Sequence, residues 1–290
     1  MIKTILAPLS GLGSDDVALE TAYRTAHLFG AHIECLHVRP GAFEMVRGMP
    51  IVDGSTTLAM PEIWQAIEAE AKTRAQSARK SFDTFSKRNE IVTVTKPTSS
   101  GRVTAEWHEV EGNQRKITLQ RARYNELVVF SHGSAGFDPL LDDVGEILVG
   151  CGRPLLIAPM EAPQTIATTV AIAWKETAEA ARAVTAAMPL LKKAQKLLIF
   201  AAAEDLATKA IEEMERLASA LRWDGFAPDV HCLVPEGSGV PDTVLKAAHQ
   251  HKADLLVMGG YGHSRAREFV LGGFTQHALR KANLPVFLFH

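Results

Sequence analysis

The sequence predicts an α/β protein made of two tandem, doubly wound domains, each with a mostly parallel five-stranded sheet flanked by helices. Short apolar runs of strand length alternate along the chain with longer amphipathic stretches, an order typical of parallel strands joined by helical crossovers. The same order also occurs twice in the 290 residues. A repeat of roughly 145 residues is too long for a solenoid, so it indicates a duplicated domain.

The first elements follow from hydrophobic periodicity. Residues 2–8 form an apolar run that predicts a strand, and residues 32–38 predict a second strand. Between them, residues 15–29 predict a helix that ends at Gly30, a residue suited to a helix C-terminus. Its apolar face consists of Leu19, Ala22, Tyr23 and Ala26. These elements make a strand–helix–strand unit.

The rest of the first half contains an additional segment. Residues 40–60 are rich in Gly, Pro and Met, which predicts a surface loop or flap, and residues 61–88 predict a long helix. Apolar runs at 126–130 and 153–158 predict the last two strands of this half.

The second half repeats the pattern. Residues 169–174 and 196–202 predict strands around a helix over 176–192, and later strands are predicted at 254–258 and 284–289. The intervening sequences at 110–112 and 235–237 also correspond, since each ends in Glu-Gly after a short strand and before a helix.

The join between the two units is predicted at residues 159–165, where two prolines interrupt the periodicity. The domains therefore extend over 1–160 and 166–290. Because ligands of such sheets bind at the carboxyl ends of strands near the reversal of strand order, the loops after Trp174, Ala202 and Met258 are the expected site.

A glycine-rich loop follows the run at 254–258. Its informative residues are Gly259, Gly262, Gly272, Gly273, Phe274 and Thr275. A loop of this kind between a strand and a helix can present backbone N–H groups and the positive helix end to a phosphate, and Thr275 adds a hydroxyl donor. The alternative is that the glycines only make a tight turn and cap a helix.

This pattern resembles the universal stress protein family in its tandem two-domain form. The family motif is Gly, two residues, Gly, nine residues, Gly, then Ser or Thr. Gly259, Gly262 and Gly272 match its spacing, Gly273 replaces the Ser or Thr, and Thr275 retains a hydroxyl. The resemblance implies an adenine nucleotide alpha hydrolase-like fold and ATP or a related adenine nucleotide as ligand. The family also includes members that do not bind nucleotide.

The sequence departs from the family in two places. Nucleotide-binding members carry Asp at the end of the first strand, near base and ribose, whereas this chain has Ser10 and Lys175. Lys175 donates hydrogen bonds but accepts none, so it either attracts phosphate or is a solvated surface residue. The first half also lacks the glycine loop after its fourth strand, at 131–136, and is therefore expected to be a degenerate, structural copy.

Composition narrows the function further. The net charge of −2 gives no indication of nucleic acid or an anionic membrane as partner, and no apolar run is long enough to span a bilayer. Three scattered cysteines suit a reducing, cytoplasmic setting. The eleven histidines show no metal-ligand spacing, so no metal site is expected. His263 and His277, beside the loop, are either hydrogen-bond donors to phosphate or partly exposed polar residues, and the second role is expected.

The chain contains no nucleophile elbow, zincin helix or P-loop, so no enzymatic activity is expected, and hydrolysis of bound ATP would be slow and incidental. Three functions remain open. They are a stress-response regulatory protein that binds ATP through its second domain, a nucleotide-free protein that acts through unknown protein partners, and an enzyme with a site beneath 40–60. The last strands, 155–158 and 286–289, are expected to pair as an internal pseudo-dimer, with a homodimer left open.

Overall fold

The structure is a computed structural model of the chain. It describes residues 1–41, 60–96, 101–132, 139–202, 207–235, 239–260 and 273–290. The expected flap, residues 40–60, lies mostly outside this set, and so do Gly262, His263 and Gly272.

The first half contributes six strands and four helices to the described part of the chain. They are β1 (Thr4–Leu9), α1 (Asp15–His27), β2 (His32–Arg39), α3 (Met60–Arg88), β3 (Val92–Thr93), β4 (Thr104–Glu111), α4 (Gln114–Ala122), β5 (Leu127–Phe130), α5 (Pro139–Cys151) and β6 (Leu155–Ile157). The two-residue strand β3 was not expected from the sequence, because its residues are exposed and carry no apolar run.

The second half repeats the order of strand and helix. It consists of β7 (Thr169–Ala173), α6 (Ala178–Leu191), β8 (Lys196–Ala202), α7 (Ala207–Trp223), β9 (Asp229–Leu233), α8 (Gly239–Gln250), β10 (Leu255–Gly259), α9 (Gly273–Lys281) and β11 (Val286–Phe289). Helix α6 begins two residues later than predicted, because the Thr177 hydroxyl caps it by accepting a hydrogen bond from the backbone N–H of Ala180.

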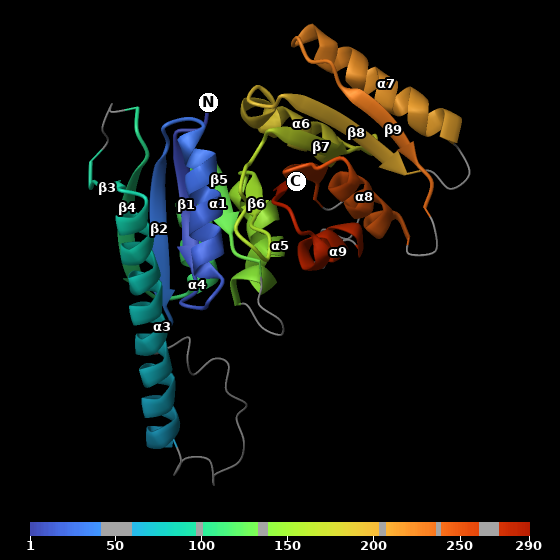
Figure 1. The fold of residues 1–290 in the computed structure, drawn as a ribbon. Coiled ribbons are helices and arrows are strands. Elements are labelled where there is room, and N and C mark those ends of the chain that lie inside the picture. Colours follow the sequence, from blue (N-terminus) through green and yellow to red (C-terminus); the bar gives the residue numbers. More distant parts are fainter. Residues whose placement is uncertain (42–59, 97–100, 133–138, 203–206, 236–238, 261–272) are drawn as a thin grey trace.

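The described strands form one sheet in the order β3-β4-β2-β1-β5-β6-β11-β10-β7-β8-β9 (Figure 1). Within each half the paired strands are parallel, and the order reverses beside the first strand. This confirms the predicted class of mostly parallel, doubly wound sheets flanked by helices.

Strands β6 and β11 join the two halves. They pair antiparallel, with Leu156 opposite Phe287 and Leu155 opposite Leu288. All four side chains are fully buried. The predicted pairing of the two last strands is therefore confirmed, and it removes two apolar edges from solvent.

The core has two layers, one on each face of the sheet. Leu255 and Val257 of β10 belong to one apolar cluster, whereas Leu256 and Met258 belong to the other. This alternation follows from the two-residue period of a strand. It explains why these strands read as continuous apolar runs, since both faces are covered by helices.

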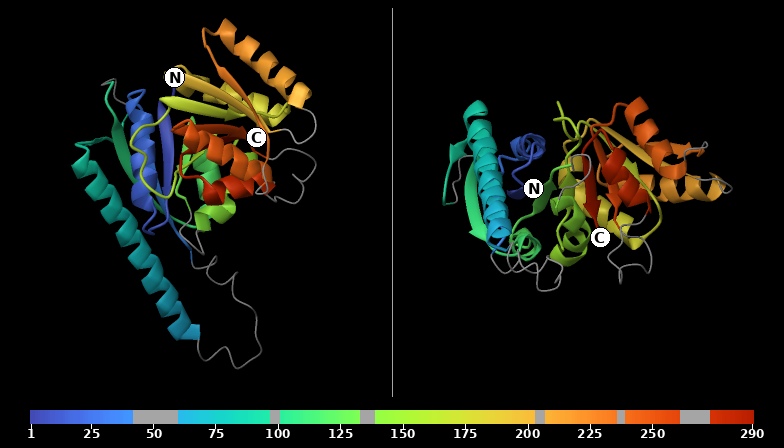
Figure 2. Two further views of the ribbon diagram at one scale, coloured as in Figure 1. Left: turned by 45° about the vertical axis from the view of Figure 1, so that its right-hand side comes forward. Right: turned by 90° about the horizontal axis from the view of Figure 1, so that it is seen from below.

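Helix α3 is unusually long, at 29 residues; its N-terminal end extends past the sheet, and its later part packs along β2, β4 and α1 (Figures 1 and 2). Its buried face includes Ala78, Phe82 and Phe85. None of the described helices is long and apolar enough to cross a membrane.

Candidate functional site

A pocket of about 630 Å³ lies at the carboxyl ends of β7, β8 and β10. Trp174, Ala202 and Met258, the strand ends indicated by the sequence, all line it. The pocket adjoins the pair β7–β10, where the strand order reverses. Its position is the one expected for a ligand site in a doubly wound sheet, and its volume is that of a small-molecule site.

Three helices begin at this pocket. The lining includes Thr177 and Ala180 at the start of α6, Val240 at the start of α8, and Gly273 and Thr275 at the start of α9. The first backbone N–H groups of a helix have no partner within it, and the N-terminal end carries a partial positive charge. The pocket therefore suits a ligand with negative charge.

The three helix ends are not electrostatically equal. The first turn of α6 contains Glu179, which lines the pocket, and the first turn of α8 contains Asp242. Helix α9 has no acidic residue in its first turn. Because a nearby carboxylate offsets the positive helix end, α9 offers the most favourable place for an anion.

His277 holds α9 against α8. Its Nε2 lies 2.7 Å from a carboxylate oxygen of Asp242, and both side chains are about one-third exposed. This contact occupies His277 with a protein partner, in agreement with its expected role as a partly exposed polar residue.

Gly259 and Gly273 differ in their surroundings. A Cβ atom on Gly259 would lie 2.6 Å from the backbone nitrogen of Ala180 and 2.8 Å from the carbonyl carbon of Glu179. Gly259 therefore allows α6 to pack closely on β10. A Cβ on Gly273 would meet no atom within 4 Å among the described residues, so none of these residues requires a glycine here for packing.

Five of the predicted site residues lie together in the pocket wall. They are Lys175, Gly259, Gly273, Phe274 and Thr275. Gly262 and Gly272 lie outside the described residues. Sequence reasoning gave no site role to the acidic side chains Glu179 and Glu213, which line the same pocket from α6 and α7; Glu213 is expected from the sequence to be a surface residue that serves only solubility. Only the helix-after-strand order, which starts both helices at this edge, could have indicated them.

Behind the pocket lies an aromatic cluster that the sequence did not reveal. The rings of His231 and His251 have centroids 4.4 Å apart, and each lies 5.6 Å from the ring of Phe200, a pocket residue. Burial lowers the pKa of His231, and the neighbouring His251 adds to this effect. The two imidazoles come from β9 and from the residue after α8, so only the tertiary fold brings them together.

The corresponding strand ends of the first half are closely packed. The buried carboxylate of Asp15 accepts hydrogen bonds from the backbone N–H groups of Ser10 and Gly11, at 2.9 and 2.8 Å, and from the Ser10 hydroxyl at 2.9 Å. A Cβ on Gly11 would collide with the backbone of Arg74 in α3. The Asp15 carboxylate thus occupies the hydrogen-bond donors of Ser10 and Gly11 that a bound anion would need in the first half.

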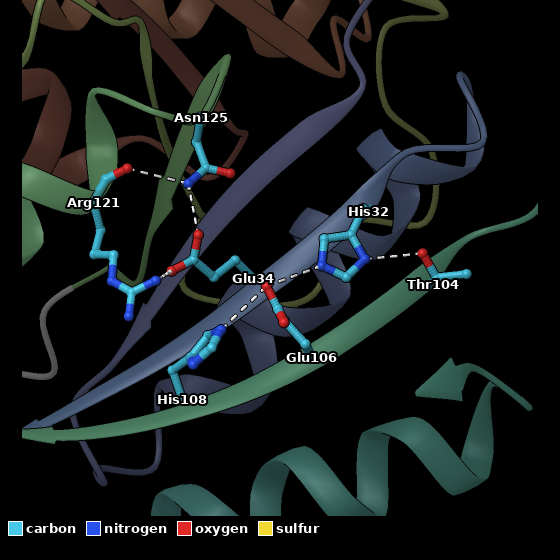
Figure 3. Close-up of polar contacts among 7 residues, drawn as sticks. All are labelled: His32, Glu34, Thr104, Glu106, His108, Arg121 and Asn125. Carbon is cyan, nitrogen blue, oxygen red and sulfur yellow. Dashed lines mark hydrogen bonds and ion pairs between the residues drawn. The ribbon is translucent and has the colours of Figure 1, made fainter. Parts of the chain in front are cut away.

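A second polar cluster lies on β2 and β4, away from the pocket (Figure 3). The buried Glu34 carboxylate accepts hydrogen bonds from Arg121 at 3.0 Å and from Asn125 at 2.9 Å, which ties α4 and the following turn to the sheet. Because each group has a protein partner, the cluster is explained by packing.

Glu106 in the same view lies between two imidazoles, with one oxygen 3.4 Å from His32 and 3.1 Å from His108 (Figure 3). In the part of the chain that the structure describes, no group of three or more His, Cys, Asp or Glu residues is arranged to hold a metal ion.

Comparison with known proteins adds to this geometry. A model of the Universal stress protein family matches residues 161–290. Universal stress protein Slr1230 from Synechocystis is 33% identical over 81 residues, and Universal stress protein MJ0577 from Methanocaldococcus jannaschii is 29% identical over 82 residues. Each alignment covers 28% of this chain and, respectively, 27% and 48% of the relative. The chain thus matches less than half the length of either relative.

The whole chain also resembles a solved structure. A universal stress protein from Archaeoglobus fulgidus superposes with a TM-score of 0.66, covering 99% of this chain and 97% of that one. The sequence identity is 15%, so this likeness concerns the fold.

Proposed function

Because residues 161–290 belong to the universal stress protein family, we propose that the chain is a stress-response regulatory protein that binds ATP or a related adenine nucleotide in the pocket of its second half. The observation that carries this proposal is the convergence of Lys175, Gly273 and Thr275 on one pocket at the strand-order reversal.

In this proposal the phosphates lie against the start of α9. The backbone N–H groups of Gly273 and Phe274 and the Thr275 hydroxyl donate to them, together with Gly262 and Gly272 from outside the described residues. Three or four charge-assisted hydrogen bonds at about 1.5–3 kcal/mol each give about 4.5–12 kcal/mol before ordering costs are subtracted, a range that includes the roughly 8 kcal/mol of micromolar affinity.

In the same proposal the base and ribose occupy the rest of the pocket, between β7 and α7. Trp174 and Ala202 line this part, and Lys175 stands where the family resemblance expects Asp. Since an ammonium group cannot accept a hydrogen bond, the pocket should discriminate weakly between bases. The absence of the Asp carboxylate at position 175 should therefore weaken selectivity for the base more than it weakens binding of the phosphates.

The experiment is to denature the purified protein, chromatograph the small molecules released, and titrate the ligand-free form with ATP and GTP by calorimetry. We expect one site per chain. Gly262→Val should abolish binding while the circular dichroism spectrum is unchanged, because the branched side chain occupies the phosphate position. Equal binding by this variant would reject the site, and two sites per chain would reject the view that the first half is degenerate.

The second candidate is a nucleotide-free interaction protein. It is favoured by the carboxylates of Glu179 and Glu213 in the pocket wall, which repel a triphosphate. It is also favoured by the close approach of α6 to Gly259, which accounts for a glycine at this position without any ligand. Absence of released nucleotide together with no heat of binding at millimolar ATP would support this candidate. The third hypothesis, an enzyme with an active site covered by residues 40–60, depends on a segment that lies largely outside the described residues.

A further inference from the structure

A groove of about 550 Å³ runs between α3 and the carboxyl ends of β2 and β4, far from the pocket in sequence and in a different half of the sheet. Its floor is formed by Arg39 at the end of β2 and Glu109 near the end of β4. Its wall is one face of α3, from Lys72 to Lys87. Figure 1 shows α3 lying along these strands.

The groove has a marked positive charge. Five basic residues line it, against two acidic ones, which leaves a net charge of +3. The basic residues are Arg39, Lys72, Arg79, Lys80 and Lys87. The surplus contrasts with the net charge of −2 for the whole chain. The groove is therefore a local concentration of positive charge.

The two acidic residues are already paired. Arg39 lies 2.8 Å from Glu109, and Arg79 lies 3.0 Å from Asp83. The three lysines are exposed and form no ion pair with any described residue. The positive charge available to a partner therefore comes from Lys72, Lys80 and Lys87.

The wall that presents these lysines is firmly held. The guanidinium group of Arg79 lies 5.6 Å from the ring centre of Phe82 and 5.5 Å from that of Trp107. Both rings pack in the core between α3 and β4. At 100° per residue, the three lysines fall within an arc of about 80° on the helix. They face the same direction without any rearrangement of the backbone.

We propose that this groove binds an extended acidic segment of a partner protein. Lys72 and Lys87 are separated by about 22 Å along the helix axis, at 1.5 Å per residue. An extended chain rises about 3.3 Å per residue, so about seven residues span this distance. A segment with Asp or Glu at alternate positions directs carboxylates to one side and reaches all three ammonium groups.

The shape of the groove favours a peptide over other polyanions. A membrane surface is flat and cannot enter a groove beside a helix, whereas a single extended chain can. Three free cations are also fewer than the six to ten phosphate contacts typical of stable binding to duplex DNA. The negative charge of the rest of the chain repels a long polyanion but affects a short segment less.

The test is fluorescence anisotropy with a labelled peptide of eight Glu residues, and a peptide of eight Gln residues as the uncharged comparison. We expect the Glu peptide to bind at low ionic strength and to weaken as salt is added. Substituting Lys72→Gln, Lys80→Gln and Lys87→Gln together should weaken binding by about tenfold, because exposed pairs contribute modestly but act together.

The matched control changes three exposed lysines elsewhere, Lys116→Gln, Lys192→Gln and Lys281→Gln, which alters net charge equally. This control should bind the Glu peptide within about twofold of the unmodified protein. Equal loss in both triple variants would show that only net charge matters and would overturn the proposal. No binding of the Glu peptide would overturn it as well. Tighter, lysine-dependent binding of duplex DNA or phosphatidylserine vesicles would assign the groove to a phosphate polyanion instead.

Discussion

Replacement of Gly259 by Ala tests whether this glycine is required for packing. The added Cβ would lie 2.6 Å from the Ala180 nitrogen, about 0.8 Å short of the 3.4 Å at which ordinary contact begins, and 2.8 Å from the carbonyl carbon of Glu179. Both neighbouring atoms belong to the backbone of α6, so no side chain can rotate away.

The helix and strand must therefore separate. Gly259 ends a buried strand, and α6 packs against β10 and β11 through Ala183, Ala187 and Leu190, which are fully buried. Overpacking of a core in this way costs about 1–3 kcal/mol. We expect the free energy of unfolding to fall by this amount, and the affinity for ATP to fall with it, because the start of α6 lines the pocket.

Urea denaturation followed by circular dichroism measures the change, with Gly273→Ala as the matched control. A Cβ on Gly273 meets no described atom within 4 Å, so its free energy of unfolding should change by less than about 0.5 kcal/mol. If Gly259→Ala is as stable as the control, the packing explanation is wrong. If both variants lose only nucleotide affinity, Gly259 is a ligand contact and its contact with α6 is incidental.

Three further predictions concern other parts of the molecule. Lys175→Asp should change the ratio of the affinities for ATP and GTP by about tenfold in calorimetric titrations, since a carboxylate accepts hydrogen bonds from a base and the two bases carry their N–H donors at different positions; an unchanged ratio would remove Lys175 from the site. A pKa of His231 below its unfolded value means that the folded state resists protonation, so stability should fall as pH drops from about 7 to 5, through the unfolded pKa near 6.5. His231→Phe should flatten this pH dependence in thermal melts, and an identical pH profile would show that other groups cause it. Leu156→Ala, opposite Phe287 in the strand pair that joins the halves, should lower the free energy of unfolding by about 2–5 kcal/mol; a loss below about 1 kcal/mol would mean that β6 contributes little to the joint core.

The sequence by itself determined the fold class and the place of the candidate site. The runs at 169–174 and 254–258 are apolar on both faces, and a buried parallel strand is the element that needs such a run. Strand order in a doubly wound sheet then directs the loops after them to one edge. For this reason the pocket next to Trp174 and Met258 could be anticipated before any contact was known.

Contacts between distant segments were decided only by the tertiary structure. Nothing in the local pattern around His231 or His251 relates the two residues, yet their rings meet because β9 and α8 pack side by side. In the same way, Gly11 lies so close to the backbone of Arg74 in α3 that a Cβ would collide with it, and no local pattern relates these two segments. Local periodicity specifies which face of an element is buried, whereas the identity of the neighbour depends on how all the elements pack together.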